Sequence, residues 1–316
     1  MVENTNNRKS VLIVGATGYI GNATVAEAVR QGYDVIAVTR SPRPEGYFHG
    51  AEVLLADVTN PASVERAFNR KIDIVISCLA CHSGLASDFD HIDYKVTLNI
   101  LNTALENGVQ QFILLSAICV RKPDLPLQLA KLKMEDALMR SGIDYTIVRP
   151  TAYFWAFEVQ NKLIAKGWPG FVIGGGEQAV HNPIAREDLA EFLVGSIDNS
   201  ERHNRLHIIG GPETSGNVIT YRDSLLMAFE SLGRKPKIIN IPSWLCMAFI
   251  RLTRFIGHFS RKIGVFSEFL HIIYYYLHDD MRAPGYGTRT LRQHMLGSET
   301  SVRSADSQAG QRPGVV

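Results

Sequence analysis

The sequence predicts an α/β protein built on a doubly wound parallel sheet, with a smaller and mostly helical C-terminal region. Three observations support this fold class. Short apolar runs rich in β-branched residues alternate with helical patterns, a glycine-rich turn follows the first run, and only helical patterns remain beyond about residue 213. With 316 residues, the chain has room for one large domain or two modest ones.

The composition is that of an ordinary globular protein, with 46% hydrophobic and 20% charged residues. A formal net charge of +2 gives no reason to expect nucleic acid as a partner. The four cysteines, Cys78, Cys81, Cys119 and Cys246, are too scattered for a disulfide framework, which favours a reducing, cytoplasmic compartment. No second pair or His set accompanies the first two, so we predict no metal site. Residues 1–9 lack an apolar targeting segment, so we expect the chain to be bacterial or already processed.

Residues 11–21 have the pattern of a buried strand, a tight turn and a helix start. Four apolar residues precede three glycines at three-residue spacing, and residues 22–31 follow as a helix. This Rossmann-like arrangement brings a backbone close to a pyrophosphate and points the positive end of the helix at it. We therefore predict dinucleotide binding. The contacting turn residues are expected to be Gly15, Thr17, Gly18, Tyr19, Ile20 and Gly21.

The second strand, over residues 34–40, indicates which dinucleotide binds. An NAD-specific site needs an acidic side chain about 20 residues after the glycine turn, to bind the ribose 2′-hydroxyl. This chain has Arg40 there, with Arg43 close behind and no carboxylate. Because a guanidinium can pair bidentately with a 2′-phosphate, we predict NADPH. The alternative is that Arg40, at the strand end, is a solvated surface arginine.

The alternation of strand and helix patterns continues along the chain. It places further residues at the carboxyl ends of strands, where open α/β sheets bind ligands. Strands are expected over residues 52–56, 72–77, 111–116, 144–149 and 207–210, with helices over 61–69, 91–107 and 127–141. Asp57 has two interpretations, a contact to the adenine amino group or a helix cap or Asx-turn before Pro61. The expected cofactor contacts beyond the turn are Arg40, Arg43, Asp57, Val58, Cys78, Leu79, Ala80, Lys131, Pro150 and Tyr153.

The C-terminal region contains predicted helices over residues 221–232 and 243–259 and an aromatic-rich apolar stretch over residues 263–276. Arg251 and Arg254 interrupt the second helix, so it is not a membrane span. These arginines and His258 share one face, with aromatic residues over the rest. One interpretation is an interfacial helix on a membrane. The other, which we favour, is a lid or core helix that covers an apolar ligand.

The expected division is a nucleotide-binding domain over 9–212, a helical substrate-binding region over 213–296 and a disordered tail over 297–316. The tail is rich in Ser, Gly and Gln and has few large apolar groups.

In its elements and its Gly-Ala-Thr-Gly-x-x-Gly turn, the chain resembles the short-chain dehydrogenase/reductase superfamily, in its extended, atypical branch. Typical members use a Tyr, with a Lys four residues later that lowers the phenol pKa, to protonate a carbonyl oxygen. Lys131 matches that lysine, but Leu127 stands where the tyrosine is expected. The resemblance therefore does not imply carbonyl reduction by that mechanism. By position alone, a solvated helix lysine is the better explanation of Lys131.

A closer resemblance, to the divinyl chlorophyllide a 8-vinyl reductases, extends over nearly the whole chain. It rests on several specific blocks in the right order: residues 115–123, 130–133, 148–154, 183–190, 210–212 and 285–291. It implies an NADPH-dependent oxidoreductase that reduces the 8-vinyl group of divinyl (proto)chlorophyllide a to an ethyl group in chlorophyll or bacteriochlorophyll biosynthesis. Isoflavone-reductase-like enzymes and non-catalytic regulators of the NmrA type belong to the same branch.

The resemblance also suggests roles for residues. We expect a hydride to reach the terminal vinyl carbon, and the resulting negative charge to spread into the tetrapyrrole before protonation. Lys131 is the candidate proton donor or electrostatic stabiliser, with Ser116 on the opposite strand end. Tyr153, Phe154 and Phe157 are expected to contact the substrate, although each aromatic taken singly is better explained by core packing. His181 or His82 could in principle bind the substrate magnesium, and we predict this role for neither.

Two further interpretations remain open at this stage. The chain could be a non-catalytic NADP(H)-binding regulator or photosystem assembly factor, as the missing tyrosine suggests. It could also be a reductase for another apolar substrate with a C=C bond. We expect a cytoplasmic protein, with peripheral contact to a photosynthetic membrane through residues 244–276 as one interpretation. The sequence predicts no oligomeric state.

Overall fold

The computed structural model describes residues 8–81, 85–257 and 259–297. The predictions made for His82, for His258 and for the tail beyond residue 297 lie outside these ranges. Contacts group the chain into two compact units. The first unit consists of Met1–Pro150, Arg186–Ile209 and Ile256–Phe269, and the second of Thr151–Ala185, Gly210–Phe255 and Leu270–Val316.

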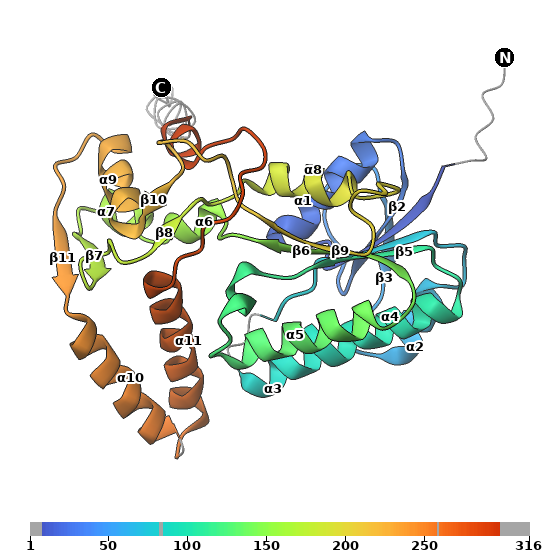
Figure 1. Ribbon diagram of the computed structural model, residues 1–316, viewed down its shortest axis with the longest axis horizontal. Helices are drawn as coiled ribbons and strands as arrows, with labels where there is room; N and C mark the ends of the chain where they lie inside the picture. Colours follow the sequence, from blue (N-terminus) through green and yellow to red (C-terminus); the bar gives the residue numbers. More distant parts are fainter. Residues whose placement is uncertain (1–7, 82–84, 258, 298–316) are drawn as a thin grey trace, which may run out of the picture. The chain divides into compact units, whose positions relative to one another are not determined.

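The first unit contains a seven-stranded sheet whose neighbouring strands are all parallel (Figure 1). Its order is β3-β2-β1-β4-β5-β6-β9, so the winding direction reverses between β1 and β4. This confirms the predicted doubly wound sheet and places a ligand crevice beyond the carboxyl ends of these two strands. The strands are β1 (Ser10–Val14), β2 (Asp34–Thr39), β3 (Glu52–Leu55), β4 (Ile74–Ser77), β5 (Gln111–Leu115), β6 (Asp144–Pro150) and β9 (Arg205–Ile209).

Helices cover both faces of this sheet (Figure 1). On one face α1 (Tyr19–Arg30) packs with α8 (Arg186–Val194), and on the other lie α2 (Pro61–Ala67), α4 (Thr97–Glu106) and α5 (Pro126–Met139). The hydrophobic core beneath α2, α4 and α5 consists of buried residues from the strands and from these helices. As predicted, the strand and helix segments alternate along the sequence. The short helices of this unit are α3 (Ala86–Phe89) and the 3₁₀ turn η2 (Ile118–Arg121).

The predicted helix over residues 91–107 consists of two parts. A π-helix, η1 (Asp90–Val96), leads directly into α4. The sequence pattern misses this change because the apolar spacing of a single π-helical turn differs little from that of an α-helix. The difference matters for function, because π-helical turns are frequent at functional sites.

The C-terminal region is mostly helical, as predicted, and the second unit also contains two small sheets. β7 (Gly170–Ile173) pairs in parallel with β11 (Ile238–Ile241), and β8 (Val180–His181) pairs antiparallel with β10 (Ile219–Thr220). These strands of two to four residues are too short to show a clear alternation in the sequence. Through them residues 151–185 group with the C-terminal part of the chain, so the contact-based division does not coincide with the boundary expected at 212. Helices of this unit include α6 (Phe154–Phe157), α7 (Asn161–Ala165) and α9 (Tyr221–Ser231).

Two further helices form a hairpin, α10 (Ser243–Gly257) and α11 (Arg261–His278). Both lie where the sequence predicts an apolar helix or stretch. Among the described residues, no helix has the length and apolar character to cross a membrane.

Candidate active site

The glycine turn after β1 fits a pyrophosphate. Gly15 has a φ of +77°, and a Cβ on it would lie 2.6 Å from the Cys78 carbonyl oxygen. A Cβ on Gly21 would lie 2.1 Å from the Gly15 oxygen, so only glycine allows α1 to begin this close to the turn. No side chain caps α1 at Gly18, which leaves its first N–H groups directed at the crevice. This backbone cradle at the positive end of a helix matches the predicted dinucleotide contacts.

The loop after β2 folds over this turn and brings an arginine with it. The Tyr47 hydroxyl donates to the Thr17 carbonyl oxygen over 3.4 Å, and the Asn22 amide donates to the Tyr47 carbonyl oxygen over 3.0 Å. The Arg43 guanidinium lies 5.5 Å from the centre of the Tyr47 ring. Arg43 and Arg40 are exposed, and neither forms an ion pair within the described residues. Both positive charges are therefore available to a phosphate bound beside the turn.

Asp57 forms the Asx-turn that was one of its two interpretations. Its Oδ1 accepts hydrogen bonds from the backbone N–H and the hydroxyl of Thr59. These bonds lower the pKa of Asp57, and the positive charge of Arg40 acts in the same direction. The cap of α2 is Asn60, whose side chain accepts from the Ala62 N–H. A contact of Asp57 with adenine stays a prediction, as does one of the half-buried Val58.

The residues after β4 line the crevice from the other side of the switch point. The Cys78 N–H donates to the Val14 carbonyl oxygen over 2.9 Å, which joins the two strand ends. Burial raises the pKa of the Cys78 thiol to about 12, so this cysteine supplies no thiolate at neutral pH. Leu79 is half-buried and Ala80 is exposed. In the ranges that the structure describes, no group of three His, Cys, Asp or Glu side chains could hold a metal ion.

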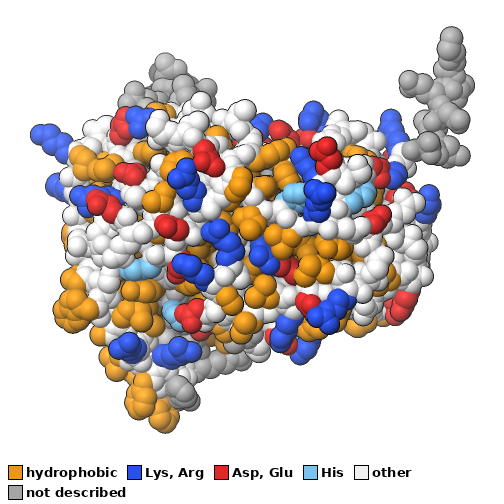
Figure 2. Space-filling model, viewed as in Figure 1, with side chains coloured by type: hydrophobic (Ala, Val, Ile, Leu, Met, Phe, Trp, Pro, Cys, Tyr) orange, Lys and Arg blue, Asp and Glu red, His pale blue; other side chains and the backbone are white. Residues whose placement is uncertain are grey.

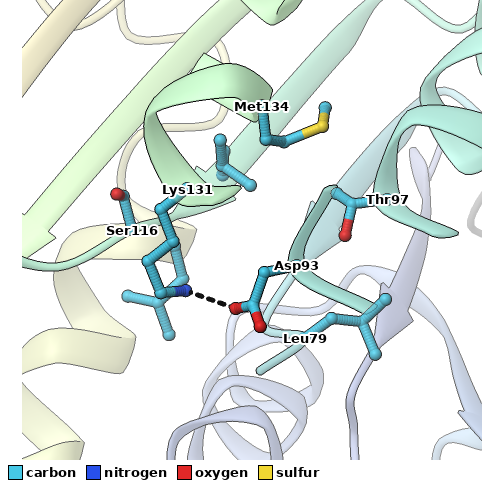
Figure 3. Close-up of a pocket in the computed structure, with 8 residues that line it drawn as sticks. Leu79, Asp93, Thr97, Ser116, Lys131 and Met134 are labelled. Carbon is cyan, nitrogen blue, oxygen red and sulfur yellow. Dashed lines mark ion pairs between the residues drawn. The ribbon is translucent and has the colours of Figure 1, made fainter. Parts of the chain in front are cut away.

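A cavity at the carboxyl edge of the sheet brings both predicted catalytic residues together (Figure 3). Its free volume is about 10 Å³. That is room for roughly one water molecule, so neither a vinyl group nor a macrocycle fits inside it in this structure. Half of its wall is apolar and half is polar. It is lined by Leu79, Asp93, Thr97, Leu114, Leu115, Ser116, Lys131 and Met134.

Lys131 is held in the cavity by Asp93, and the two side chains point toward one another from α5 and η1 (Figure 3). Their Nζ and Oδ1 atoms lie 2.9 Å apart, with 11% and 2% of the side chains exposed. Asp93 Oδ2 accepts a hydrogen bond from the Cys81 N–H. Burial alone would lower the pKa of Lys131, but the charge of Asp93 and its hydrogen bond raise it above its ordinary value. Lys131 therefore presents a fixed positive charge at neutral pH.

The neighbouring Lys133 shows what a solvated lysine on this helix looks like. Its ammonium pairs with Asp90 at 2.9 Å, but 57% of the lysine side chain and 33% of the aspartate side chain are exposed. The solvated alternative is thus correct for Lys133 and wrong for Lys131.

Ser116 belongs to a second buried network. Its hydroxyl donates to Glu135, which is 1% exposed and also receives the Arg149 guanidinium on both carboxylate oxygens. Since the hydroxyl hydrogen is engaged by the carboxylate, the Ser116 oxygen can take part in a further hydrogen bond only as an acceptor. Arg149 neutralises the carboxylate, which would otherwise be an unpaired buried charge.

Sequence reasoning missed Asp93, Glu135 and Arg149. Signals for two of them were present. Asp93 has the helical spacing of the buried Val96, Thr97 and Ile100, which puts an acid on an apolar face. Arg149 is a charge inside an otherwise apolar strand, and such a residue needs a buried partner.

The predicted substrate residues lie in the second unit. Tyr153 precedes α6 and bridges to Ile184. Phe154 and Phe157 are 2% and 4% exposed and belong to a hydrophobic cluster, so protein atoms already cover their rings. Core packing, which the sequence also allowed, describes these two residues in this structure, and substrate contact by Tyr153 stays a prediction.

Pro150, the last residue of β6, is buried at the strand end. Its place at the carboxyl edge agrees with the expected position, and its contact with a cofactor stays a prediction.

The glycine turn, the strand order and the crevice at the switch point define a protein of the nicotinamide-dinucleotide-binding α/β class. Residues 15–200 match the family described as NAD(P)H-binding. The fold agrees with that of NADPH-dependent quinone oxidoreductase QOR2 from Escherichia coli, with a TM-score of 0.66, 17% identity and coverage of 93% of this chain and 99% of that chain.

Sequence comparison identifies the family of this chain within the nicotinamide-dinucleotide-binding class. The divinyl chlorophyllide a 8-vinyl-reductase of Cucumis sativus is 34% identical, over 93% of this chain and 79% of its own length. The photosystem II assembly factor Ycf39 of Guillardia theta is 27% identical, over 78% of this chain and 77% of its own length. The chain belongs to the divinyl chlorophyllide a 8-vinyl-reductase family.

Proposed function

We propose that this protein is an NADPH-dependent oxidoreductase that reduces the 8-vinyl group of divinyl chlorophyllide a, or of its protochlorophyllide counterpart, to an ethyl group. The observation that carries the proposal is the 34% identity to a reductase of this name, spread over 93% of the chain. The same relationship suggests a role in chlorophyll or bacteriochlorophyll biosynthesis and a small-molecule tetrapyrrole as the partner.

Residues of the first unit fit the cofactor. The cradle of Gly15, Gly18 and Gly21 would hold the pyrophosphate, and Arg40 and Arg43 would hold the 2′-phosphate that distinguishes NADPH from NADH. When bound, NADPH supplies a hydride. Everything else in the reaction is left to the chain's own side chains.

The cavity supports reduction of a C=C bond better than reduction of a carbonyl. Carbonyl reduction needs an acid aimed at one oxygen, and Leu127 occupies the place of the usual tyrosine. A conjugated vinyl group instead develops negative charge that spreads over a ring system. The buried ammonium of Lys131, fixed by Asp93 beside apolar walls, would stabilise such charge strongly because little water screens it.

Lys131 could also deliver the proton that completes the reduction. Its three donors allow it to keep its bond to Asp93 while a second N–H points into the cavity. Ser116 would act as an acceptor that orients a group in the same cavity, because Glu135 fixes its hydroxyl.

A direct assay tests the proposal. The purified protein is incubated with divinyl chlorophyllide a and either NADPH or NADH, and the Soret band and the retention time of the pigment are followed. We expect conversion to the monovinyl pigment with NADPH and much slower conversion with NADH. Binding of pigment or NADPH without conversion would refute the reductase proposal.

One specific observation favours a second function. The assembly factor Ycf39 is a relative at 27% identity, and the missing tyrosine is compatible with a protein that holds NADP(H) without turnover. Tight NADPH binding with no turnover of any pigment would support that alternative. Turnover of another apolar C=C compound alone would instead indicate a reductase with a different substrate.

We also propose where in the cell the protein works. An apolar pigment substrate partitions into membranes, so we propose a cytoplasmic protein that works at the surface of a photosynthetic membrane.

A further inference from the structure

The α10–α11 hairpin has its apolar residues on the outside. Six large apolar side chains of α10 are exposed, from 38% for Ile256 to 71% for Trp244. At 3.6 residues per turn they occupy an arc of about 140° on one side of the helix. The two buried residues of α10, Ile250 and Thr253, lie on the opposite side. The exposed residues are Trp244, Leu245, Phe249, Leu252, Phe255 and Ile256.

The residues from Ile256 to Phe269, which belong to the first unit, carry further exposed aromatic side chains. Phe259, in the turn, is 81% exposed, and Phe266 and Phe269 of α11 are 47% and 53% exposed. Hydrophobic side chains gather at the end of α10 and α11, with Lys and Arg side chains next to them (Figure 2). Single exposed apolar residues are common on protein surfaces, but here the exposed apolar side chains form a continuous face along α10. We call these nine residues the hairpin surface.

The hairpin is held together by its own contacts, so the exposure is not that of a frayed segment. At its open end, Ser243 Oγ lies 3.2 Å from His278 Nε2. At its tip, a Cβ on Gly257 would lie 2.8 Å from the Gly264 Cα, so the two helices approach closely there. The buried Ile250 and Thr253 lie on the side of α10 away from the apolar arc, so its apolar side is turned outward. A core helix does not account for side chains this exposed, whereas a lid over an apolar ligand stays a prediction.

The charge beside the hairpin surface is positive. Between residues 243 and 267 the sequence has no Asp or Glu, but it has Arg251, Arg254, Arg261 and Lys262. Arg251 and Arg254 are exposed and flank one edge of the apolar arc. The first acid is Glu268, and one of its carboxylate oxygens is buried. Apolar and aromatic residues beside basic ones, without acids, are the pattern of a helix that lies in an anionic lipid interface.

We infer that the hairpin surface docks the protein on a membrane that contains anionic lipids. A second copy of the chain would bring the same arginines against each other, which opposes self-association through this surface. A negatively charged lipid surface removes that repulsion and buries the aromatic residues at headgroup depth. The inference does not depend on the reductase reaction, and it adds a surface and a lipid class to the location proposed above.

Flotation of the full chain with lipid vesicles tests the inference without any pigment. We expect binding to vesicles of phosphatidylcholine with about one-third phosphatidylglycerol, and weaker binding to phosphatidylcholine alone. The double variant Trp244→Ser/Leu252→Ser should lower the partition coefficient about tenfold or more. Arg251→Ser/Arg254→Ser should lower it about ten- to thirtyfold on anionic vesicles only.

The matched control changes the same residue types elsewhere. Trp168 and Leu129 are 58% and 52% exposed outside the hairpin, so Trp168→Ser/Leu129→Ser should bind vesicles like the unchanged chain. Thermal unfolding confirms that each variant is folded. No binding of the unchanged chain, or an equal loss in the control, would overturn the inference. So would a change from dimer to monomer in Trp244→Ser/Leu252→Ser without vesicle binding, since that outcome assigns the surface to a second copy.

Pigment turnover in detergent distinguishes this inference from the proposed function. If the protein reduces pigment but does not bind vesicles, the proposed function is supported and the docking surface is refuted. If it binds vesicles but does not reduce pigment, the docking surface is supported and the proposed function is refuted.

Discussion

The carboxyl edge of the sheet and the hairpin surface depart from the usual distribution of residues in opposite directions. At the sheet edge, Lys131, Asp93 and Glu135 are charged and buried, whereas in the hairpin Trp244 and Phe259 are apolar and largely exposed. Buried charges destabilise a fold unless they are paired, and a broad exposed apolar face lowers solubility unless a partner covers it. Each departure therefore indicates an interaction that the fold alone does not need. One region is suited to stabilising charge in a reaction, and the other to binding a surface.

The largest effect expected from this comparison is on stability at the sheet edge. Arg149→Leu leaves the Glu135 carboxylate buried without its cation, and we expect the free energy of unfolding to fall by about 3–5 kcal/mol. Chemical denaturation at neutral pH measures this change. Arg140→Leu is the control, because Arg140 pairs with Asp136 one helical turn away on the exposed side of α5, and a few tenths of a kcal/mol is expected. Equal losses in the two variants would mean that burial of the charge is unimportant.

Turnover should depend on the inner lysine and not on the outer one. Lys131→Met removes the buried positive charge, and we expect kcat to fall about 10²–10³-fold, equivalent to about 3–4 kcal/mol. NADPH affinity should change far less. Lys133→Met, on the same helix, removes an exposed charge and should leave kcat nearly unchanged. Near-normal turnover in Lys131→Met would exclude this lysine from the mechanism.

The same contrast explains how much the sequence could predict. The spacing of apolar residues and the residue types found in turns indicate backbone geometry. The sheet and the alternation of strands and helices could therefore be predicted, as could the glycine turn at Gly15 and Gly21. The pairing of Lys131 with Asp93 does not follow, because it joins residues 38 positions apart through a π-helix that the apolar pattern does not reveal.

The hairpin shows a second limit of prediction from the sequence. Its helices were predictable from apolar content, but apolar content is the same for a buried and an exposed face. Only the structure shows that Ile250 faces inward and Phe255 outward. The short strands of the second unit were unpredictable for a related reason, since two residues of β8 cannot display a period.

The second unit should respond to acid, because it buries a titratable group without a counter-charge in contact. Burial lowers the pKa of His181 to about 4, although the charge of Asp280 acts in the opposite direction. Below pH 6.5 the unfolded chain binds a proton at this histidine and the folded chain does not, so stability falls as the pH drops from about 6.5 to about 4. The loss should approach about 3 kcal/mol.

Urea unfolding at pH 7 and pH 4.5 measures this loss. In His181→Phe the difference between the two pH values should shrink, because the ring nitrogen that resists protonation is gone. His49→Gln, which changes an exposed histidine, should leave the difference as it is in the unchanged chain. If His181→Phe keeps the full difference, the acid sensitivity belongs to other groups.

The smallest expected effect concerns the cofactor and lies at the exposed rim of the sheet edge. Arg40→Ala removes a guanidinium that can reach a 2′-phosphate, so the Kd for NADPH should rise about 10–100-fold while the Kd for NADH changes little. Arg43→Ala should act in the same direction but more weakly, because this arginine also lies against Tyr47. Arg70→Ala is the control, since Arg70 pairs with Glu52 at the amino edge of the sheet, away from any phosphate beside the turn. Titration of intrinsic fluorescence with both nucleotides gives the four pairs of constants. Equal weakening of NADPH and NADH in Arg40→Ala would show that the arginine supports the fold of the loop and does not select the cofactor.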